Sequence, residues 1–491
     1  MPYSSVFDKL AWLNLRQALR ELRRTPGPRS RSRRSGALEG GNAMTSLWKA
    51  NITGPTGQLY AEPKPTPGEL SFQVDNTSAE YYTSPYYKAH KSQVQPIPPP
   101  RPNALPYLHF ENFIPAEILA AIHAAGRIAF HAVGDTGAAK VNRSQTAATA
   151  IGHEAAVADA MVADVHSGGA DGPAFFFHLG DIIYNFGEAQ YYYDQFYEPF
   201  REYDRPIFAI PGNHDGMVFG QGSSAPQVPT LDAYLANFCA AAPGSSPDSC
   251  GLVRSVMTQP GVYFTLDAPF VSIIGLYSNV LDTGGGVISS QGGHFPLTDD
   301  QLTFLKYELT RLKPRRQNGE RAVLIAVHHP PLSVDAKHGG STGLAQDIDS
   351  CCQAAGLWPD AVLSGHAHLY ERFTCRVNGR QVPYIVSGSG GFAATRPLSG
   401  LPKAPITIGD HTLELDPIVE FGYLTITTDA ETLTVTFKTA TAAGVATRDA
   451  VTVDLPSGRI TTGSSATALK PAPHPGPHPP PHPKRPPHKK R

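Results

Sequence analysis

The sequence predicts an α/β fold, because short apolar strand candidates alternate with helix candidates along the middle of the chain. Ile128–Val133 and Phe175–Leu179 are two such strands, and the alanine-rich stretch Ala147–Val165 between them is predicted as a helix. Turn residues follow most of the strands, as is typical of buried strands. Residues that can bind metals recur just after these strands, at the edge where α/β sheets hold their ligands.

Further elements continue this alternation toward the C-terminus. The additional strand candidates are Ile207–Ile210, Ala322–Val327, Ala361–Leu363 and Tyr384–Val386. Asp299–Leu312 is predicted as a helix that begins with a capping box formed by Thr298 and Gln301. Beyond Phe421 polar and apolar residues alternate, which predicts an antiparallel meander at the edge of the core sheet. Its strands are Tyr423–Thr427, Leu433–Phe437 and Val451–Val453.

Composition divides the 491 residues into a folded body with an extension at each end. Hydrophobic residues make up 41% of the chain, enough for a large core. We expect a basic, disordered extension over residues 1–44 and an arm or linker rich in proline and tyrosine over residues 45–113. A folded domain over residues 114–460 is followed by a disordered tail, rich in proline, histidine and lysine, over residues 461–491.

The basic residues are concentrated in the two extensions. Residues 1–36 carry nine lysines and arginines against two acids, and residues 461–491 carry six against none, while the whole chain has 41 basic and 42 acidic residues. The body is therefore acidic, whereas an enzyme of nucleic acids would more often have a basic body. We expect no nucleic-acid partner.

The segment Ser5–Arg24 has the spacing of a basic amphipathic helix, with Trp12, Leu15 and Leu19 on one face. One interpretation is attachment to an anionic membrane surface. The interpretation that we favour is a frayed extension, for which Met44 is a candidate alternative start. No run of 18 apolar residues predicts a transmembrane helix.

The N-terminus lacks the uninterrupted apolar stretch of a secretion signal, which predicts a cytoplasmic protein and leaves secretion as the alternative. The five cysteines are an odd number, and we favour free thiols in a reducing compartment. Cys239 and Cys250 bracket a loop rich in glycine, serine and proline, so a disulfide between these two residues is the alternative.

Five short motifs occur between Asp135 and His368, each at or just after the end of an apolar run. They are Gly134-Asp135-Thr136-Gly137, Gly180-Asp181-Ile182-Ile183-Tyr184, Gly212-Asn213-His214-Asp215, His328-His329-Pro330 and Gly365-His366-Ala367-His368. Their carboxylate, amide, imidazole and phenol groups suit iron, zinc or manganese rather than a zinc ion bound by thiolates. They are enough for two metal ions that share one ligand, an arrangement suited to displacement at phosphorus.

Each motif also has an ordinary structural interpretation. A lone Gly-Asp is a weak signal, and Gly-Asn is typical of turns. Asp181, however, is costly to bury at a strand end unless it is paired or metal-bound, so it is the candidate for the ligand that two cations share. Asn213 would be a ligand beside it, and His214 would face the leaving group as an acid. Three histidines in two short motifs are harder to explain as structural: His328, His366 and His368.

In this order the motifs resemble those of the metallophosphoesterase (calcineurin-like) superfamily over residues 127–440, and more narrowly those of the purple acid phosphatases. The superfamily usually opens with Asp-x-His, whereas this chain has Asp135-Thr136-Gly137. Tyr184 follows Asp181 in the Asp-x-x-Tyr form of the purple phosphatases, so the resemblance implies that its phenolate replaces the missing imidazole. The alternative, Tyr184 as a core aromatic residue, would leave one metal a ligand short.

The resemblance implies a four-layer α/β/β/α sandwich of two mixed sheets, with a dinuclear metal site at the C-terminal ends of the strands. An Fe(III) site would be formed by Asp135, Asp181, Tyr184 and His368. A second site, for zinc, manganese or Fe(II), would be formed by Asp181, Asn213, His328 and His366. His214 would contact the phosphate, and His338 would be a further histidine on the substrate side.

The resemblance implies that residues 114–460 are a catalytic domain that hydrolyses a phosphate ester. The expected substrate is a small-molecule phosphomonoester, and the expected nucleophile is a metal-bound hydroxide. A phosphodiesterase of the same superfamily is the first alternative, and a non-catalytic metal-binding module is the second. A protein Ser/Thr phosphatase is disfavoured, because that group continues Gly-Asp with an acid and Arg-Gly, where this chain has Ile182-Ile183-Tyr184.

Overall fold

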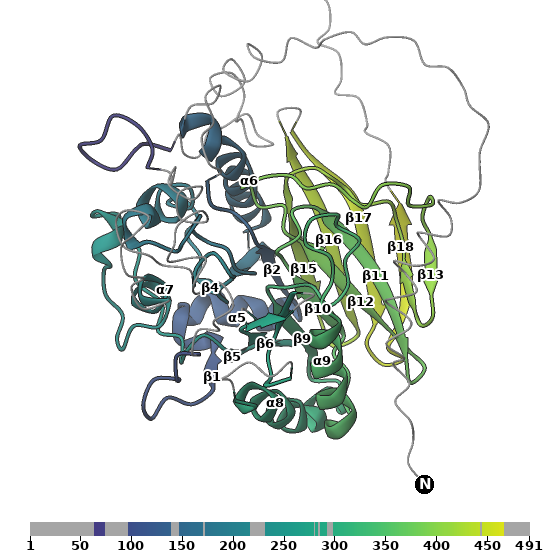
Figure 1. The fold of residues 1–491 in the computed structure, drawn as a ribbon. Coiled ribbons are helices and arrows are strands. Elements are labelled where there is room, and N and C mark those ends of the chain that lie inside the picture. The colour runs from purple at the N-terminus through teal and green to yellow at the C-terminus, as the bar shows by residue number, and fades with distance from the viewer. Residues whose placement is uncertain are drawn as a thin grey trace, which may run out of the picture.

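The structure is a computed structural model. It describes residues 63–73, 97–138, 147–169, 172–216, 231–278, 280–282, 285–291, 298–441 and 444–465. Two sheets lie face to face and helices cover their outer faces, which confirms the predicted α/β sandwich of two mixed sheets (Figure 1). The predicted helix Ser5–Arg24 and the tail beyond Ser465 lie outside the described residues.

The larger sheet holds nine strands in the described part of the chain. In spatial order they are β1 (Tyr107–His109), β5 (Phe264–Ala268), β6 (Val271–Leu276), β9 (Ala322–Val327), β10 (Ala361–Ser364), β12 (Arg380–Ser387), β11 (Tyr370–Val377), β14 (His411–Leu413) and β13 (Ile406–Ile408). The central strands β6, β9, β10 and β12 are parallel to one another. The strands β11, β14 and β13 form an antiparallel edge.

The smaller sheet holds seven strands among the residues described. In spatial order they are β18 (Arg459–Ser465), β17 (Gly444–Asp454), β16 (Thr432–Thr441), β15 (Gly422–Thr428), β2 (Ile128–Val133), β3 (Pro173–His178) and β4 (Ile207–Ala209). The strands β2, β3 and β4 are parallel, and β15 to β18 form the predicted antiparallel meander at the edge of this sheet. The last strand, β18, reaches into the range that the sequence assigned to the tail.

Helices connect and cover these strands. The α-helices of the described residues are α5 (Ala116–Ala125), α6 (Ala147–Gly168), α7 (Asp232–Phe238), α8 (Asp300–Gln317) and α9 (Thr342–Ala355). The shorter elements are η1 (Phe110–Phe113), η3 (Ala189–Tyr191), the π-helical turn η4 (Tyr193–Tyr197), η5 (Pro247–Ser249) and the hairpin of β7 (Val280–Asp282) and β8 (Gly285–Val287). Over these ranges, no helix combines the length and the apolar character needed to span a membrane.

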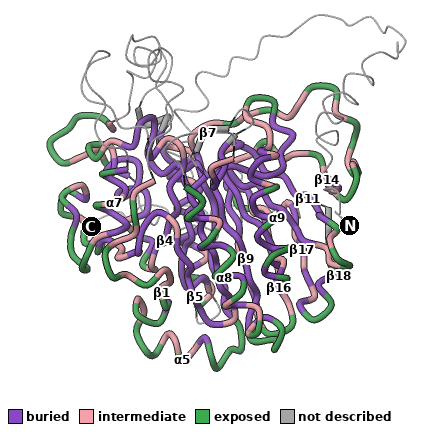
Figure 2. Tube along the Cα trace, turned by 60° about the horizontal axis from the view of Figure 1, so that its bottom comes forward, coloured by how far each residue is buried: buried purple, intermediate pink, exposed green. Residues whose placement is uncertain are grey.

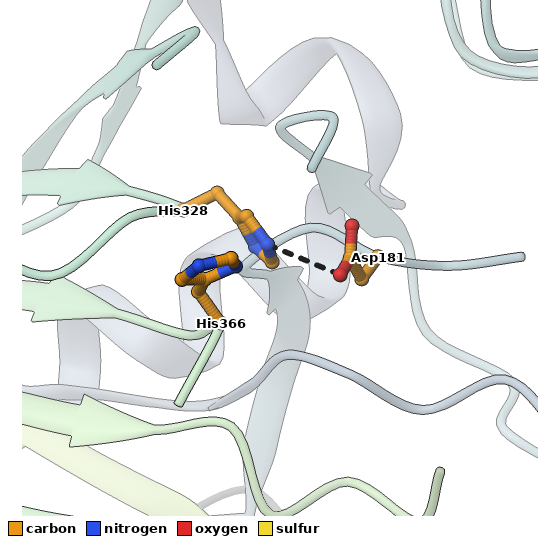
Figure 3. A group of neighbouring side chains, drawn as sticks. All are labelled: Asp181, His328 and His366. Atoms are coloured by element: carbon orange, nitrogen blue, oxygen red, sulfur yellow. Dashed lines mark ion pairs between the residues drawn. The ribbon is translucent and has the colours of Figure 1, made fainter. Parts of the chain in front are cut away.

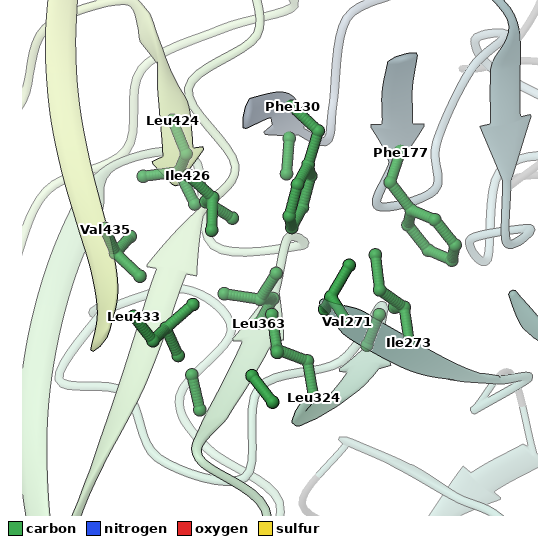
Figure 4. Close-up of a cluster of buried hydrophobic side chains, with 14 of the residues drawn as sticks. Phe130, Phe177, Val271, Ile273, Leu324, Leu363, Leu424, Ile426, Leu433 and Val435 are labelled. Carbon is green, nitrogen blue, oxygen red and sulfur yellow. The ribbon is translucent and has the colours of Figure 1, made fainter. Parts of the chain in front are cut away.

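The main hydrophobic core lies between the two sheets. Phe130 and Leu424 of the smaller sheet pack in one cluster with Leu324 and Leu363 of the larger sheet (Figure 4). Side chains alternate across a strand, so Val133 of β2 belongs instead to the cluster on the outer face of the smaller sheet. Each sheet is therefore buried on both faces in its central part.

The helices form the two outer layers. Met161 of α6 packs with Val133 of β2, and Leu305 of α8 and Ile348 of α9 pack with Ile325 of β9. Figure 2 shows the buried strands inside and the exposed loops and helix faces outside. Strands buried on both faces are continuous apolar runs, which is why β2 and β9 have the bounds that the sequence predicts.

Some residues before the predicted boundary at 114 also join the fold. The strand β1 pairs with β5 from Tyr107 onward, and Phe110 is fully buried in the main core. The guanidinium of Arg101 donates hydrogen bonds to the carbonyls of Thr258 and Gln259, at 2.8 and 3.1 Å. The described parts of the segment rich in proline and tyrosine therefore lie against the domain.

The predicted capping box at the start of α8 is wrong. The helix begins at Asp300, and Thr298 Oγ1 donates to Asp300 Oδ2 at 2.7 Å instead of capping a backbone N–H. Gln301 turns into the core, where its amide pairs with the backbone N–H and carbonyl of Tyr277 at 2.9 and 2.7 Å. The capping box needs the side chain of Gln301, but this side chain is already bound to the backbone of Tyr277, which is distant in the sequence.

A buried ion pair joins the two sheets. Asp449 on β17 accepts hydrogen bonds from Arg372 Nε at 2.6 Å and from Tyr370 Oη at 2.7 Å, both on β11. All three side chains are buried. Removing one partner of such a pair would leave an uncompensated charge inside the protein, which is strongly destabilising.

Candidate metal centre

The predicted metal ligands follow strands of both sheets. Those that follow β2, β3 and β4 of the smaller sheet are Asp135, Asp181, Tyr184 and Asn213. Those that follow β9 and β10 of the larger sheet are His328, His366 and His368. The backbone N–H of His366 donates to Asp135 Oδ2 at 2.8 Å, so the two sets of strand ends are in direct contact.

One group of side chains surrounds the hydroxyl of Tyr184. Its Oη lies 3.0 Å from Asp135 Oδ1 and 3.0 Å from Asp181 Oδ2, and it can donate its proton to either. His368 Nε2 lies 3.3 Å from Asp135 Oδ1. All four side chains are buried. The structure thus brings together the residues predicted for the ferric site, whose binding of a metal stays a prediction.

A second group contains Asp181, His328 and His366 (Figure 3). One potential ligand atom from each of the three lies within 4.8 Å of the others, a spacing that can accommodate a metal ion. His328 Nε2 lies 3.2 Å from Asp181 Oδ2 and 3.2 Å from Asn213 Oδ1. The structure therefore also brings together the residues predicted for the divalent site.

Asp181 joins the two groups through a single oxygen atom. Its Oδ2 is the atom that lies 3.0 Å from Tyr184 Oη and 3.2 Å from His328 Nε2. Its Oδ1 accepts a hydrogen bond from the backbone N–H of His214 at 2.8 Å. This bond fixes the carboxylate so that Oδ2 faces both groups, as a bridging ligand requires.

A hydrogen bond between the sheets orients the imidazole of His328. Its Nδ1 lies 2.8 Å from the carbonyl oxygen of Leu179, and a carbonyl can only accept, so Nδ1 carries the proton. In the neutral ring Nε2 then holds the lone pair, directed at Asp181 and Asn213. Partners of this kind set the tautomer of metal-binding histidines.

The backbone at the strand ends adopts conformations that most residues avoid. Asp135, Asp181 and His366 have φ values of 60°, 55° and 66°, in the left-handed region. A Cβ atom at Gly212 would lie 2.1 Å from Asp181 Oδ1, and one at Gly365 would lie 2.6 Å from Asp135 Oδ2. Backbone strain clusters at functional sites, and these glycines leave the carboxylates the room that they occupy.

The electrostatics of the two groups favour a cation. Burial, and then the charges of Asp135 and Asp181, raise the pKa of Tyr184 well above its usual value of 10. Burial opposes protonation of His328, but the nearby charge of Asp181 outweighs it and raises the pKa of His328 to about 9. A metal ion among these groups would offset the repulsion between the carboxylates and the phenol oxygen. Oxygen and nitrogen donors also suit iron, zinc or manganese, so the residues present fit such ions.

The two predicted catalytic histidines lie beside the ligand groups. His214 Nδ1 is 2.7 Å from the carbonyl oxygen of Asn185, and its ring centroid is 4.5 Å from that of Tyr184. The His338 ring lies 4.5 Å from that of His366, and its Nδ1 is 3.0 Å from Asp335 Oδ2. The structure therefore places both histidines at the site, while their roles stay predictions.

Three further residues at the site were not singled out from the sequence. Asp215, the fourth residue of its motif, accepts a hydrogen bond from the backbone N–H of Gly212 at 2.8 Å. The ring of His329, the second histidine of its motif, lies 4.1 Å from that of His366. In the sequence, Asp215 could have been found from its place in the motif, and His329 from its place beside His328. Phe392, which stacks on Tyr184 with centroids 3.5 Å apart, had no such signal.

Residues 128–370 match the sequence model of the calcineurin-like phosphoesterase family. This range contains all the predicted ligands. No curated protein matches the chain by sequence.

Several solved structures are similar to the chain. The purple acid phosphatase PPD1 from yellow lupin (Lupinus luteus) seeds is 17% identical with a TM-score of 0.45, over 70% of this chain and 57% of that one. PhoD is 12% identical with a TM-score of 0.43, over 70% and 73%. GAP50, the anchor in the inner membrane complex of Plasmodium, is 14% identical with a TM-score of 0.40, over 70% and 90%. The chain thus spans little more than half of the lupin protein.

Proposed function

We propose, on the premise that residues 128–370 are a calcineurin-like phosphoesterase domain, that this protein is a metal-dependent hydrolase of phosphate esters. We propose further that it is a phosphomonoesterase with a dinuclear centre of the purple acid phosphatase type. The observation that carries the proposal is the position of Asp181 Oδ2, within 3.0 Å of Tyr184 Oη and 3.2 Å of His328 Nε2. One carboxylate oxygen in contact with two sets of donors is the arrangement that a shared ligand needs.

The two donor sets would hold two different ions. A ferric ion suits the set with the phenol: Asp135, Asp181, Tyr184 and His368. A zinc, manganese or ferrous ion suits the set with two imidazoles and an amide: Asp181, Asn213, His328 and His366. Bound ions would supply Lewis acidity for the phosphate and for the attacking water.

The side chains around the donors would handle the substrate. Because Nδ1 of His214 is held by the carbonyl of Asn185, the ring keeps one orientation relative to Tyr184 and can present Nε2 to a phosphate oxygen or to the leaving group. The carboxylate of Asp335 lies 3.0 Å from Nδ1 of His338, which leaves Nε2 of that ring for the substrate. Two positioned histidines could thus stabilise or protonate a departing alkoxide.

The test of this proposal is analysis of protein purified without chelator. The expected result is two metal ions per chain, one of them iron. A phenolate bound to Fe(III) gives a visible charge-transfer band, and we expect this band in the wild type and its disappearance in Tyr184→Phe. Hydrolysis of p-nitrophenyl phosphate should be faster than hydrolysis of bis(p-nitrophenyl) phosphate. The opposite preference would identify a phosphodiesterase, and bound metals without either activity would identify a binding module. Colourless, active protein with two divalent ions would reject Tyr184 as a ligand of Fe(III). It would not contradict the proposal that the protein hydrolyses phosphate esters.

A further inference from the structure

The backbone that carries Asp181 and Tyr184 is held by two buried side chains. Asp215 Oδ1 accepts hydrogen bonds from the N–H groups of Ile182 and Ile183 at 2.9 and 3.1 Å. Gln195 Oε1 accepts from the N–H of Tyr184 at 3.0 Å, and its Nε2 donates to the carbonyl of Tyr184 at 3.1 Å. Every residue between Asp181 and the end of the motif is thus fixed by a side chain from elsewhere in the chain.

Gln195 also reaches the turn that follows Asp135. Its Oε1 accepts a second hydrogen bond, from the N–H of Ala138 at 3.0 Å, and the whole side chain has no exposed surface. One amide group therefore connects the turn after β2 to the residue that would complete the ferric site. Moving this amide would change the position of Tyr184 relative to Asp135.

The preceding residue of η4, Asp194, binds this turn to the segment 63–73. Its carboxylate accepts hydrogen bonds from the N–H and the hydroxyl of Thr66 and from the N–H of Gln73, each at 2.9 Å. Glu198, one residue beyond η4, accepts from the N–H of Lys64 at 2.6 Å. The segment 63–73, far upstream of the phosphoesterase domain, is therefore bound to the same turn that supports Tyr184.

We infer that Gln195 is a positioning residue for Tyr184, and that segment 63–73 supports it through Asp194. The inference rests on the proposed function in one respect, the role of Tyr184 as a metal ligand. Side chains that orient a ligand commonly affect metal affinity by about 10–100-fold when they are changed. Methionine in place of Gln195 would fill a similar volume and leave three buried backbone groups without their partner.

The chain offers a matched control for this substitution. The amide of Gln301 makes the same pair of hydrogen bonds with the backbone of Tyr277, at 2.9 and 2.7 Å, and it is equally buried. Gln301 lies on α8 and contacts none of the predicted ligands through this pair. Gln301→Met therefore reproduces the general cost of losing a buried amide without touching Tyr184.

The experiment compares full-length wild type, Gln195→Met and Gln301→Met as purified. The readouts are the wavelength of the visible band and the chelator concentration that removes half of the iron. Gln195→Met should shift the band and lower that concentration by about tenfold or more, whereas Gln301→Met should match the wild type. Equal behaviour of the two variants overturns the inference. If the wild-type protein itself lacks the visible band, both the inference about Gln195 and the proposal that Tyr184 binds iron fail. The spectrum of the wild type alone distinguishes this outcome from a failure of the inference only.

A second variant covers the case in which Gln195→Met does not fold. Asp194→Asn keeps the shape of the side chain but replaces one accepting oxygen by an NH2 group. That group cannot accept the hydrogen bonds that Thr66 and Gln73 donate, so at least one of them is lost. It should shift the band in the same direction, by a smaller amount. Iron retention and a band identical to those of the wild type would show that segment 63–73 does not support Tyr184.

Discussion

Gly137 faces the ring of Tyr184 so closely that a Cβ atom at position 137 would lie 2.9 Å from Tyr184 Cδ2. The same atom would lie 2.7 Å from the carbonyl oxygen of Ile182 and 2.7 Å from Gln195 Oε1. A side chain at position 137 and the observed position of Tyr184 therefore exclude each other. A side chain at position 137, where the superfamily usually has a histidine, would therefore compete for space with the tyrosine that we propose as its replacement.

Gly137→Ala should consequently displace Tyr184. We expect a shifted or weakened visible band and easier loss of iron to chelator, because the neighbours are backbone and buried side chains that cannot simply move aside. Gly244→Ala is the control, since a Cβ atom there meets nothing within 4 Å. A Gly137→Ala protein with an unchanged spectrum would show that the ring has more freedom than the structure indicates.

Asp181→Asn should remove both metals, because one oxygen atom of Asp181 faces both donor sets. The amide keeps the size of the carboxylate and an acceptor for the N–H of His214, but it loses the charge that two cations would share. Elemental analysis of the purified variant is the measurement. Two metal ions per chain in this variant would reject the bridging role.

His214→Ala should leave the metal content near that of the wild type and lower kcat by roughly 10²–10⁴-fold, the usual effect of losing a positioned acid. The ring bonds to the Asn185 carbonyl, and the contact with Asp181 comes from the backbone, which alanine keeps. His411→Ala, on the strand β14 between β11 and β13, is the control and should keep full activity. Loss of metal together with activity would instead make His214 a ligand or a structural residue.

Asp164 should make the stability of the fold depend on pH in the acid range. Burial opposes its ionisation, but the hydrogen bond from His131 and the charge of Lys438 outweigh burial and lower the pKa of Asp164 to about 2. Lys438 Nζ lies 2.6 Å from Asp164 Oδ2, and Tyr423 Oη donates to the same oxygen at 2.9 Å. A depressed folded-state pKa stabilises the protein above the unfolded value of 3.8, and this stabilisation is lost as pH falls toward 2.

The variant Asp164→Asn should therefore unfold more easily at pH 5 and above, by about 2 kcal/mol, and the difference should shrink as pH falls from 4 to 2. Chemical denaturation of both proteins at several pH values measures it. A difference that stays constant across this window would mean that packing, and not the charge of Asp164, accounts for the loss.

Some parts of the fold and of the candidate site could be predicted because the signal is local. The strands β2 and β9 are apolar runs buried on both faces, and each ends in a turn with a polar residue, Asp135 or His328. Parallel neighbours bring such ends to the same edge of each sheet, which groups Asp135 with Asp181 and His328 with His366. The family resemblance, and not the strands alone, predicted that the two edges meet in one site. Side-chain chemistry then indicated a metal centre.

Other parts could not be predicted because their signal comes from distant residues. The strand β11 contains Glu371 and Arg372, which suggest a surface segment, yet both are buried. Arg372 is accepted there because Asp449, 77 residues away, neutralises it from the other sheet. Gln195 is an unremarkable polar residue in the sequence, and only the folded chain shows that it holds Tyr184.

The proposed metal ligands come from two sheets, so the site is complete only after both sheets have been synthesised and have packed together. Asp135, Asp181 and Asn213 leave the ribosome before any of the histidines of β9 and β10. A nascent chain that stops short of His368 holds an incomplete set of donors, and a finished chain whose sheets are still apart keeps the two halves separated. In a protein that binds metal as proposed, occupancy would report that both sheets have docked. Chelated protein should accordingly be cut faster by proteases than metal-loaded protein, because the bound ions stabilise only the assembled state.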